Sequence, residues 1–227
     1  MIEFCGVTLR YPYDEFAVLK NISFTLQKGV NTVICDSQSG KTSLCKLLCN
    51  QVAAESGNIL LNGEEISRIT NQDRGILYLS KTPAFFERRS VEFNVGYPLR
   101  LRRIPKSEIH QRVIQTAEKV GIAHLLQSKA SKLNADNRIR LALARGLTVE
   151  RKVILWDGLF DGDGITLSID EGLALFNAPT QVIFTERTDV LLGNVVVLDG
   201  GECVYCGDAE GAKEVVKSLK YWLAKKL

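Results

Sequence analysis

The stretch that most limits the possible folds is NTVICDSQSGKTSLCKLLCNQV, residues 31–52. It opens with a largely apolar segment, Thr32 to Cys35, that has the character of a buried strand. A loop of small and polar residues follows, and then a segment with Leu44, Leu47 and Leu48 on one face of a predicted helix. Strand, small-residue loop and helix, in that order, predict an α/β fold with a phosphate-binding loop.

Such a loop works because backbone N–H groups close around phosphates, while a lysine and a hydroxyl serve the outer phosphates and Mg²⁺. Gly40, Lys41 and Thr42 supply the end of this motif, whereas Cys35 stands where its first glycine is expected. The predicted nucleotide-binding residues of the loop are Cys35, Asp36, Ser37, Gln38, Ser39, Gly40, Lys41, Thr42 and Ser43.

Composition indicates one globular unit without a nucleic-acid partner. The 227 residues are 45% hydrophobic, enough for a substantial core, and the net charge of +3 is too small for a nucleic-acid footprint or a polybasic anchor. We found neither a secretion signal nor an apolar run long enough to span a membrane, so we expect a cytoplasmic protein. The six cysteines are expected to be thiols, and neither zinc nor haem is expected, because the CxxC of Cys203 and Cys206 has no second ligand pair.

The pattern along the chain changes twice. An alternating, β-rich opening gives way to helical periodicity between Ser90 and Arg145, with amphipathic helices predicted at 109–120 and 138–147. Strand signals return from Lys152, with a hairpin turn at 199–201, and a final amphipathic helix is predicted to pack its apolar face against the domain. That face comprises Val215, Val216, Leu219, Trp222 and Leu223.

The whole chain resembles the nucleotide-binding subunit of ABC transporters, and its helical part resembles the carbohydrate-importer type. The resemblance is carried by LRYP…AVLKNISFTLQKG, by SGNILLNGEEIS after the loop helix, by residues 97–147, and by VILWDG at the position of the Walker B strand. It implies a P-loop NTPase cassette, with a RecA-like core and antiparallel β subdomain at about 1–82 and 148–227. A helical subdomain is expected at about 83–147.

The resemblance also implies ligands and partners. ATP and Mg²⁺ are expected, with Tyr11 stacking on adenine and with Thr42 and Asp157 serving the metal. Two cassettes would pair head to tail, as a homodimer or heterodimer, beneath a transmembrane permease at the inner face of the cell membrane. The permease-facing groove would include Phe85, Phe86, Arg88 and Arg89.

Three positions depart from the catalytic pattern that the resemblance implies. Gly158 stands at the catalytic glutamate and provides no base, and Glu186 stands at the switch histidine, where it would repel a γ-phosphate. Lys81 occupies the Q-loop glutamine position, either as a substitute for the metal that pairs with Asp157 or as a solvated loop lysine. Whether Asp161 or Asp163 compensates for the missing base stays open.

The signature motif also differs, with Leu133, Asn134, Ala135, Asp136 and Asn137 in place of LSGGQ. Asn134 or Asp136 is predicted to cap the following helix with its own oxygen, which would occupy donors that a phosphate uses. Together these changes predict a degenerate cassette with weak ATP binding and little or no hydrolysis. The alternative is a working importer ATPase with non-standard motifs, favoured by the retained lysine, threonine and Walker B aspartate. A DNA-repair or translation-factor cassette is disfavoured, because no coiled-coil insertion or second cassette is present.

Overall fold

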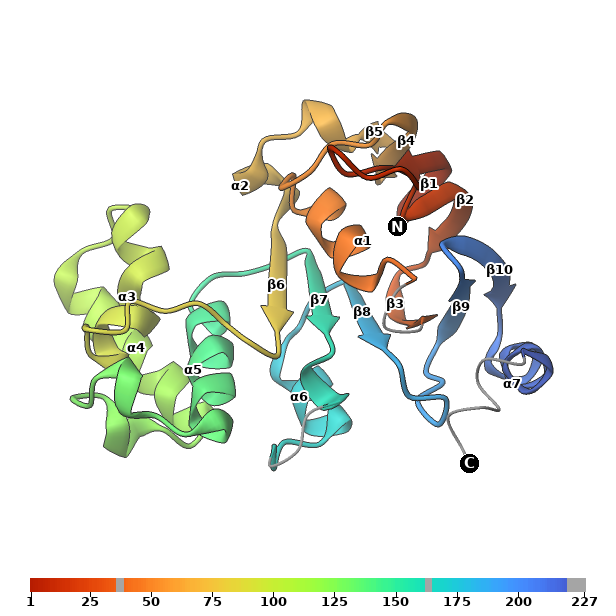
Figure 1. Ribbon diagram of the computed structural model, residues 1–227. Coiled ribbons are helices and arrows are strands. Elements are labelled where there is room, and N and C mark those ends of the chain that lie inside the picture. The colour runs from red at the N-terminus through yellow and green to blue at the C-terminus, as the bar shows by residue number, and fades with distance from the viewer. Residues whose placement is uncertain (36–38, 162–164, 220–227) are drawn as a thin grey trace. The chain divides into compact units, whose positions relative to one another are not determined.

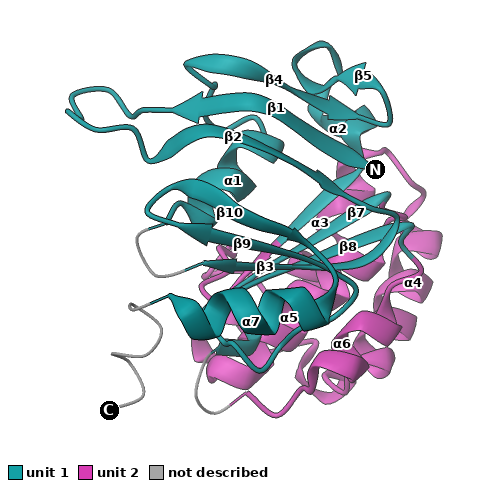
Figure 2. Ribbon diagram, turned by 90° about the vertical axis from the view of Figure 1, so that its right-hand side faces the viewer, with its two compact units in different colours: residues 1–78, 152–161, 178–227 teal, residues 79–151, 162–177 magenta. Residues whose placement is uncertain are grey.

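The computed structural model describes residues 1–35, 39–161 and 165–219, which divide into two compact units. Unit 1 comprises Met1–Tyr78, Lys152–Asp161 and Ala178–Leu227, and unit 2 comprises Leu79–Arg151 and Gly162–Asn177 (Figure 2). Among the described residues, no helix is both long and apolar enough to cross a membrane.

Unit 1 begins with a four-stranded antiparallel sheet in the order β2-β1-β4-β5. The strands are β1 (Ile2–Leu9), β2 (Leu19–Leu26), β4 (Ser56–Leu61) and the short β5 (Glu64–Glu65). The register between β1 and β4 shifts after Cys5, where Gly57 has φ 80° and lies against the Gly6 carbonyl. A Cβ at Gly57 would meet that oxygen at 2.2 Å, so only glycine fits this bulge.

The second sheet has six strands in the order β10-β9-β3-β8-β7-β6 (Figure 1). Its strands are β3 (Gly29–Cys35), β6 (Ile76–Ser80), β7 (Val153–Asp157), β8 (Thr180–Thr185), β9 (Asn194–Asp199) and β10 (Glu202–Gly207). β3 pairs in parallel with β8 and β9, and β7 pairs in parallel with β8. Every residue of β7 and β8 is buried, as expected for parallel strands covered on both faces.

Helices cover both faces of this sheet. α1 (Lys41–Leu48) lies between the two sheets (Figure 2), where Leu44, Leu47 and Leu48 join one apolar core with residues of both. α7 (Ala209–Ser218) packs Ala212 and Val216 against the other face. The predicted packing of the C-terminal helix is therefore confirmed for its first part, whereas Trp222 and Leu223 lie outside the described residues. Unit 1 also contains the short α2 (Asn71–Arg74) and the 3₁₀ turns Ile66–Arg68 and Leu159–Asp161.

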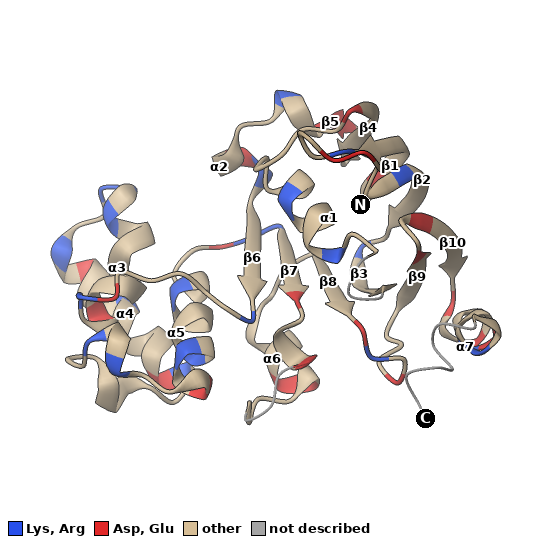
Figure 3. Cartoon of the chain, viewed as in Figure 1, with Lys and Arg blue, Asp and Glu red and all other residues tan. Residues whose placement is uncertain are grey.

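Unit 2 is helical. It comprises α3 (Val91–Leu101), α4 (Lys106–Lys119), α5 (Ala135–Leu147) and α6 (Ile169–Leu175), with 3₁₀ turns at Ala123–Leu125 and Ala130–Lys132. α3 and α4 approach closely at Gly96, where a Cβ would meet Ile109 Cγ2 at 2.9 Å and Val113 Cγ2 at 3.2 Å. Lys and Arg residues occur along α3, α4 and α5 (Figure 3).

Candidate nucleotide site

The site in unit 1 forms where strand β3 ends and α1 begins. Gly40 is the N-cap of α1 with φ 89°, and a Cβ there would meet Leu19 Cδ2 at 2.5 Å. Glycine is therefore required for both the backbone conformation and the space, and it brings no side chain in front of the helix N-terminus. Asp36, Ser37 and Gln38 lie outside the described residues, whereas Ser39 is buried beside the turn.

Lys41 is surrounded by the chain's own carboxylates. Its Nζ lies 3.4 Å from Oε1 of Glu186, just after β8, and 3.8 Å from Oδ2 of Asp161, just after β7. Only 13% of the Lys41 side chain is exposed. The three groups meet because the carboxyl ends of parallel strands lie at the same edge of a sheet.

The charges around Lys41 stabilise its ammonium form. Burial by itself would lower the pKa of Lys41, but ionisable groups near the ammonium outweigh burial and raise the pKa above its ordinary value. In order of effect these groups are Cys35, Glu186, Asp161 and Asp157.

Asp157, at the end of β7, is the second centre of the site and is 6% exposed. Its Oδ2 accepts hydrogen bonds from Thr42 Oγ1 at 3.2 Å and from the hydroxyl of Tyr78 at 2.6 Å. Burial and the hydrogen bond to Asp157 raise the pKa of Tyr78 far above its ordinary value, so the phenol stays a proton donor. Tyr78 was not foreseen from the sequence, since only the pairing of β6 beside β7 brings it to Asp157.

These surroundings fit the expected ligands unequally. Thr42 and Asp157 fit Mg²⁺, because a hydroxyl and a carboxylate that already touch are hard oxygen donors of the kind this ion takes directly or through water. The surroundings of Lys41 do not fit a terminal phosphate, because two carboxylates already occupy the ammonium. No cluster of three His, Cys, Asp or Glu suited to another metal occurs in residues 1–35, 39–161 and 165–219.

Gly158 follows Asp157 with φ 60°, and its N–H donates to the Phe184 carbonyl at 3.0 Å. The left-handed backbone favours glycine, so a glutamate at this position would be strained. Asp161, whose reach was an open question, is held close to Lys41 rather than in open solvent. Asp163 lies outside the described residues.

Tyr11, the expected adenine contact, is turned towards α1. Its hydroxyl is 3.1 Å from Ser43 Oγ, Lys46 Nζ lies 5.5 Å from the ring centroid, and the ring packs against the core. Two residues further along, Tyr13 is fully exposed with φ 73°. Tyr13 and Phe16 are both exposed aromatic side chains of this loop, and stacking of Tyr11 on adenine stays a prediction.

The signature segment, residues 133–137, belongs to unit 2, and the side chains of Asn134 and Asp136 form hydrogen bonds with other residues of that unit. Asn134 is the N-cap of α5, and its Oδ1 accepts from the backbone N–H of Asn137 at 2.9 Å, so one of the two predicted caps is confirmed. The other candidate, Asp136, is not the cap. It accepts from Arg140 at 2.7 Å and from both the N–H and the hydroxyl of Thr166 at 2.9 Å.

Leu133 and Ala135 flank the cap of α5 without polar side chains. Burial by itself would raise the pKa of Asp136, but the hydrogen bonds from Arg140 and Thr166 outweigh burial and lower the pKa below its ordinary value.

Lys81 directly follows β6 and is exposed in unit 2. Its proposed partner Asp157 belongs to unit 1, and the positions of the parts relative to one another are not determined (Figure 1). The pairing therefore stays a prediction.

The loop after Lys81 is held to α5. The guanidinium carbons of Arg138 and Arg145 lie 5.1 and 4.8 Å from the ring centroid of Phe85, and Arg138 also pairs with Glu87 at 2.6 Å. Phe86, by contrast, is 42% exposed. It lies edge-on to Phe93 at 5.5 Å between ring centroids, so an aromatic surface is open on this unit.

The fold and this site define a P-loop cassette of the ABC type. Residues 19–160 match the model of the family described as ABC transporter, and the chain belongs to this family. Membership implies the use of ATP and Mg²⁺. The structure is also similar to that of a bacterial Atm1-family ABC exporter with ATP bound, with a TM-score of 0.81 and 18% sequence identity. The match covers 99% of this chain and 41% of the exporter chain, and it shows the fold.

Curated relatives are import ATP-binding proteins. The chain is 36% identical over 149 residues to the molybdate/tungstate import ATP-binding protein WtpC of Thermococcus kodakarensis, covering 65% of this chain and 45% of the relative. It is 32% identical over 146 residues to the spermidine/putrescine import ATP-binding protein PotA of Thermotoga maritima, covering 64% and 40%. The sulfate/thiosulfate import ATP-binding protein CysA of Mycobacterium tuberculosis is 32% identical over 149 residues, covering 65% and 42%.

The chain thus spans less than half the length of these relatives. Their names refer to oxyanions and polyamines, and the carbohydrate-importer type expected from the sequence stays a prediction.

Proposed function

We propose that the chain is the nucleotide-binding-type subunit of an ABC importer, in which it docks on a transmembrane permease and hydrolyses ATP weakly or not at all. The observation that carries the second part is the pair of carboxylates on Lys41. The names of the relatives support import. The permease, and not the residues described above, would determine the transported substrate.

The loss of hydrolysis is supported by what the site lacks and by what it has gained. Gly158 offers no group to take a proton from an attacking water, and a positioned base typically contributes about 10²- to 10⁴-fold to a rate. Asp161 does not replace it, because its oxygens are engaged with Lys41 and with the Thr185 hydroxyl at 2.6 Å. The same chain therefore has neither the base nor an uncommitted substitute among these residues.

A working ATPase is the second candidate, and one observation is compatible with it. Thr42 Oγ1 and Asp157 Oδ2 lie 3.2 Å apart, which retains the pair that would hold Mg²⁺. When bound, Mg²⁺ neutralises phosphate charge. Retention of this pair fits nucleotide binding as well as hydrolysis, so it does not discriminate between the two candidates.

Phosphate release by the purified protein with its permease tests the proposal. We expect turnover at background level, unchanged by Lys41→Ala, with Lys46→Ala as a matched control because that lysine lies on the same helix. Robust turnover that Lys41→Ala abolishes and Lys46→Ala preserves would establish the working ATPase and refute the pseudo-ATPase proposal.

Docking is proposed to use the aromatic surface of unit 2. Phe86 lies 4.6 Å from Tyr97 between ring centroids, and Arg89 and Arg100 flank Phe93 at 5.1 and 4.7 Å. Exposed aromatic and arginine side chains are the types that concentrate at the centres of protein interfaces.

Co-purification with the permease, with which the chain would be co-expressed, tests the docking surface. Phe86→Asp should abolish co-purification, whereas Val204→Asp, at an equally exposed apolar residue of unit 1, should leave it intact. Equal retention of the permease by both variants would rule out docking through Phe86.

Dimerisation with a second cassette belongs to the same proposal and is measured by the mass of the purified complex.

A further inference from the structure

The placement of Glu186 bears on which nucleotide the site binds, as well as on hydrolysis. Its Oε1 lies 3.4 Å from the ammonium of the phosphate-loop lysine, and 34% of its side chain is exposed. A lysine in this loop reaches the outer phosphates of a nucleotide. Glu186 therefore stands beside the atom that a terminal phosphate must contact.

The carboxylates on Lys41 are positioned by the chain and are not an accident of two flexible side chains. Thr185 Oγ1 donates to Asp161 at 2.6 Å, and the backbone N–H of Glu186 donates to the other Asp161 oxygen at 3.4 Å. The turn after β8 is closed by the N–H of Arg187, which donates to the Thr185 hydroxyl at 3.0 Å. The turn thus fixes the backbone of Glu186 next to Lys41.

From this geometry we propose that the site selects a nucleoside diphosphate over the corresponding triphosphate, with Glu186 as the residue that determines the specificity. The inference rests on the proposed function only in taking the phosphate loop as a nucleotide site. A diphosphate brings its β-phosphate to the helix N-terminus and Lys41 and places no third phosphate beside Glu186. A triphosphate adds negative charge beside Glu186 and competes with it for the same ammonium.

The size of the preference follows from the charges. Two like unit charges 4 Å apart in water disfavour each other by about fivefold in an equilibrium constant, and more strongly in a partly buried site. Since Glu186 is about one-third exposed, we expect the lower end of this range. ADP should therefore bind more tightly than a non-hydrolysable triphosphate by at least about fivefold.

Calorimetric titration with ADP and with adenylyl-imidodiphosphate, each with Mg²⁺, measures this ratio without any activity assay. Glu186→Gln keeps the shape and removes the charge, so it should strengthen triphosphate binding relative to ADP by about fivefold or more. Asp189→Asn is the matched control, since it removes an exposed, ion-paired acid from the same loop. It should leave the ratio within about twofold.

The inference is overturned if the wild type binds the triphosphate as tightly as ADP, if Glu186→Gln changes both affinities equally, or if neither nucleotide binds. Thermal unfolding verifies that each variant is folded, and Asp161→Asn provides the same test should Glu186→Gln not fold. The outcome is independent of the turnover test, because a chain that hydrolyses ATP can still prefer ADP, and a chain without turnover can still prefer ATP.

Discussion

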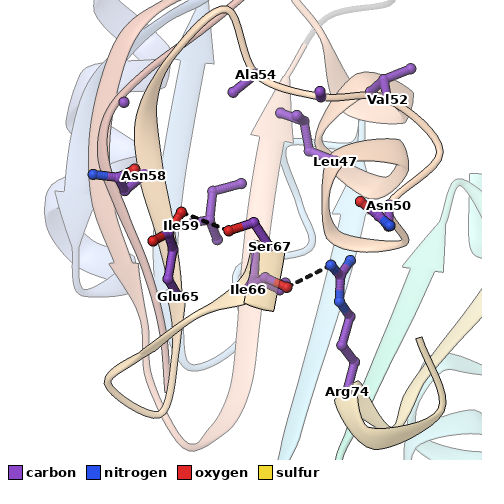
Figure 4. Close-up of a pocket in the computed structure, with 12 residues that line it drawn as sticks. Leu47, Asn50, Val52, Ala54, Asn58, Ile59, Glu65, Ile66, Ser67 and Arg74 are labelled. Atoms are coloured by element: carbon purple, nitrogen blue, oxygen red, sulfur yellow. Dashed lines mark hydrogen bonds between the residues drawn. The ribbon is translucent and has the colours of Figure 1, made fainter. Parts of the chain in front are cut away.

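Replacement of Arg74 by methionine should destabilise unit 1 strongly. Arg74 is 2% exposed, and its guanidinium donates to the carbonyls of Ile69 at 3.0 Å and Leu48 at 3.1 Å. It also donates to the carbonyl of Ile66, the bond drawn in Figure 4. It lines a cavity of about 200 Å³ and joins the C-terminal end of α1 to the turn after β5. The arginine therefore secures the far end of the helix that begins at the phosphate loop.

The expected loss follows from these bonds. Each hydrogen bond from a charged donor contributes about 1.5–3 kcal/mol, but bonds made by one group are not additive and burial of the charge costs part of the gain. We expect Arg74→Met to lower the free energy of unfolding by about 3–5 kcal/mol, comparable to breaking a buried ionic contact.

Urea unfolding followed by the fluorescence of Trp156, which is fully buried in β7, measures the loss. Arg68→Met is the control, because that side chain is 77% exposed and its ion pair with Glu65 should contribute no more than about 1 kcal/mol. A loss below about 1 kcal/mol for Arg74→Met would refute the reasoning, because three buried carbonyls would then have found other donors.

Three further variants test the site. Asn134→Ala should cost about 1 kcal/mol and speed amide exchange in the first turn of α5, and unchanged exchange would contradict its role as the cap. The lowered pKa of Asp136 means that its stabilising contribution is complete above the ordinary carboxyl pKa and is lost as pH falls through the folded pKa. The difference in free energy of unfolding between the wild type and Asp136→Asn should therefore become smaller below about pH 4. A difference that does not change with pH would refute this assignment. Tyr78→Phe removes a donor from Asp157 Oδ2 and should tighten Mg²⁺ binding in titrations with ADP, whereas weaker binding would show that the phenol helps to hold the metal.

Much of the fold could be predicted because its signals are local. The apolar segment before Cys35 and the glycines after Asp199 lead directly to β3 and to the β9–β10 turn. Helix starts were placed too late: α5 begins at Ala135 and not at 138, because its cap lies upstream of the apolar periodicity. α6 was overlooked, although Ser168 and Glu171 form a capping box whose S-x-x-E pattern is visible in the sequence.

The site was less predictable because its decisive contacts join distant parts of the chain. Glu186 and Lys41 could each be assigned a role from the family pattern, but their ion pair depends on the parallel pairing of β3 with β8. Tyr78 carries no motif at all. The packing of the Tyr11 ring against α1 is likewise not encoded by alternating polarity.

The ion pairs of Lys41 also make its presence weaker evidence for ATP hydrolysis. In the sequence, a lysine at this place favours a working ATPase. In the structure, Lys41 is ion-paired with two carboxylates of its own chain, so the lysine has a structural role even in a chain that never hydrolyses ATP. Thr42 likewise satisfies an oxygen of the buried Asp157. Both residues would be retained for the stability of the strand ends, and their presence therefore supports neither candidate over the other.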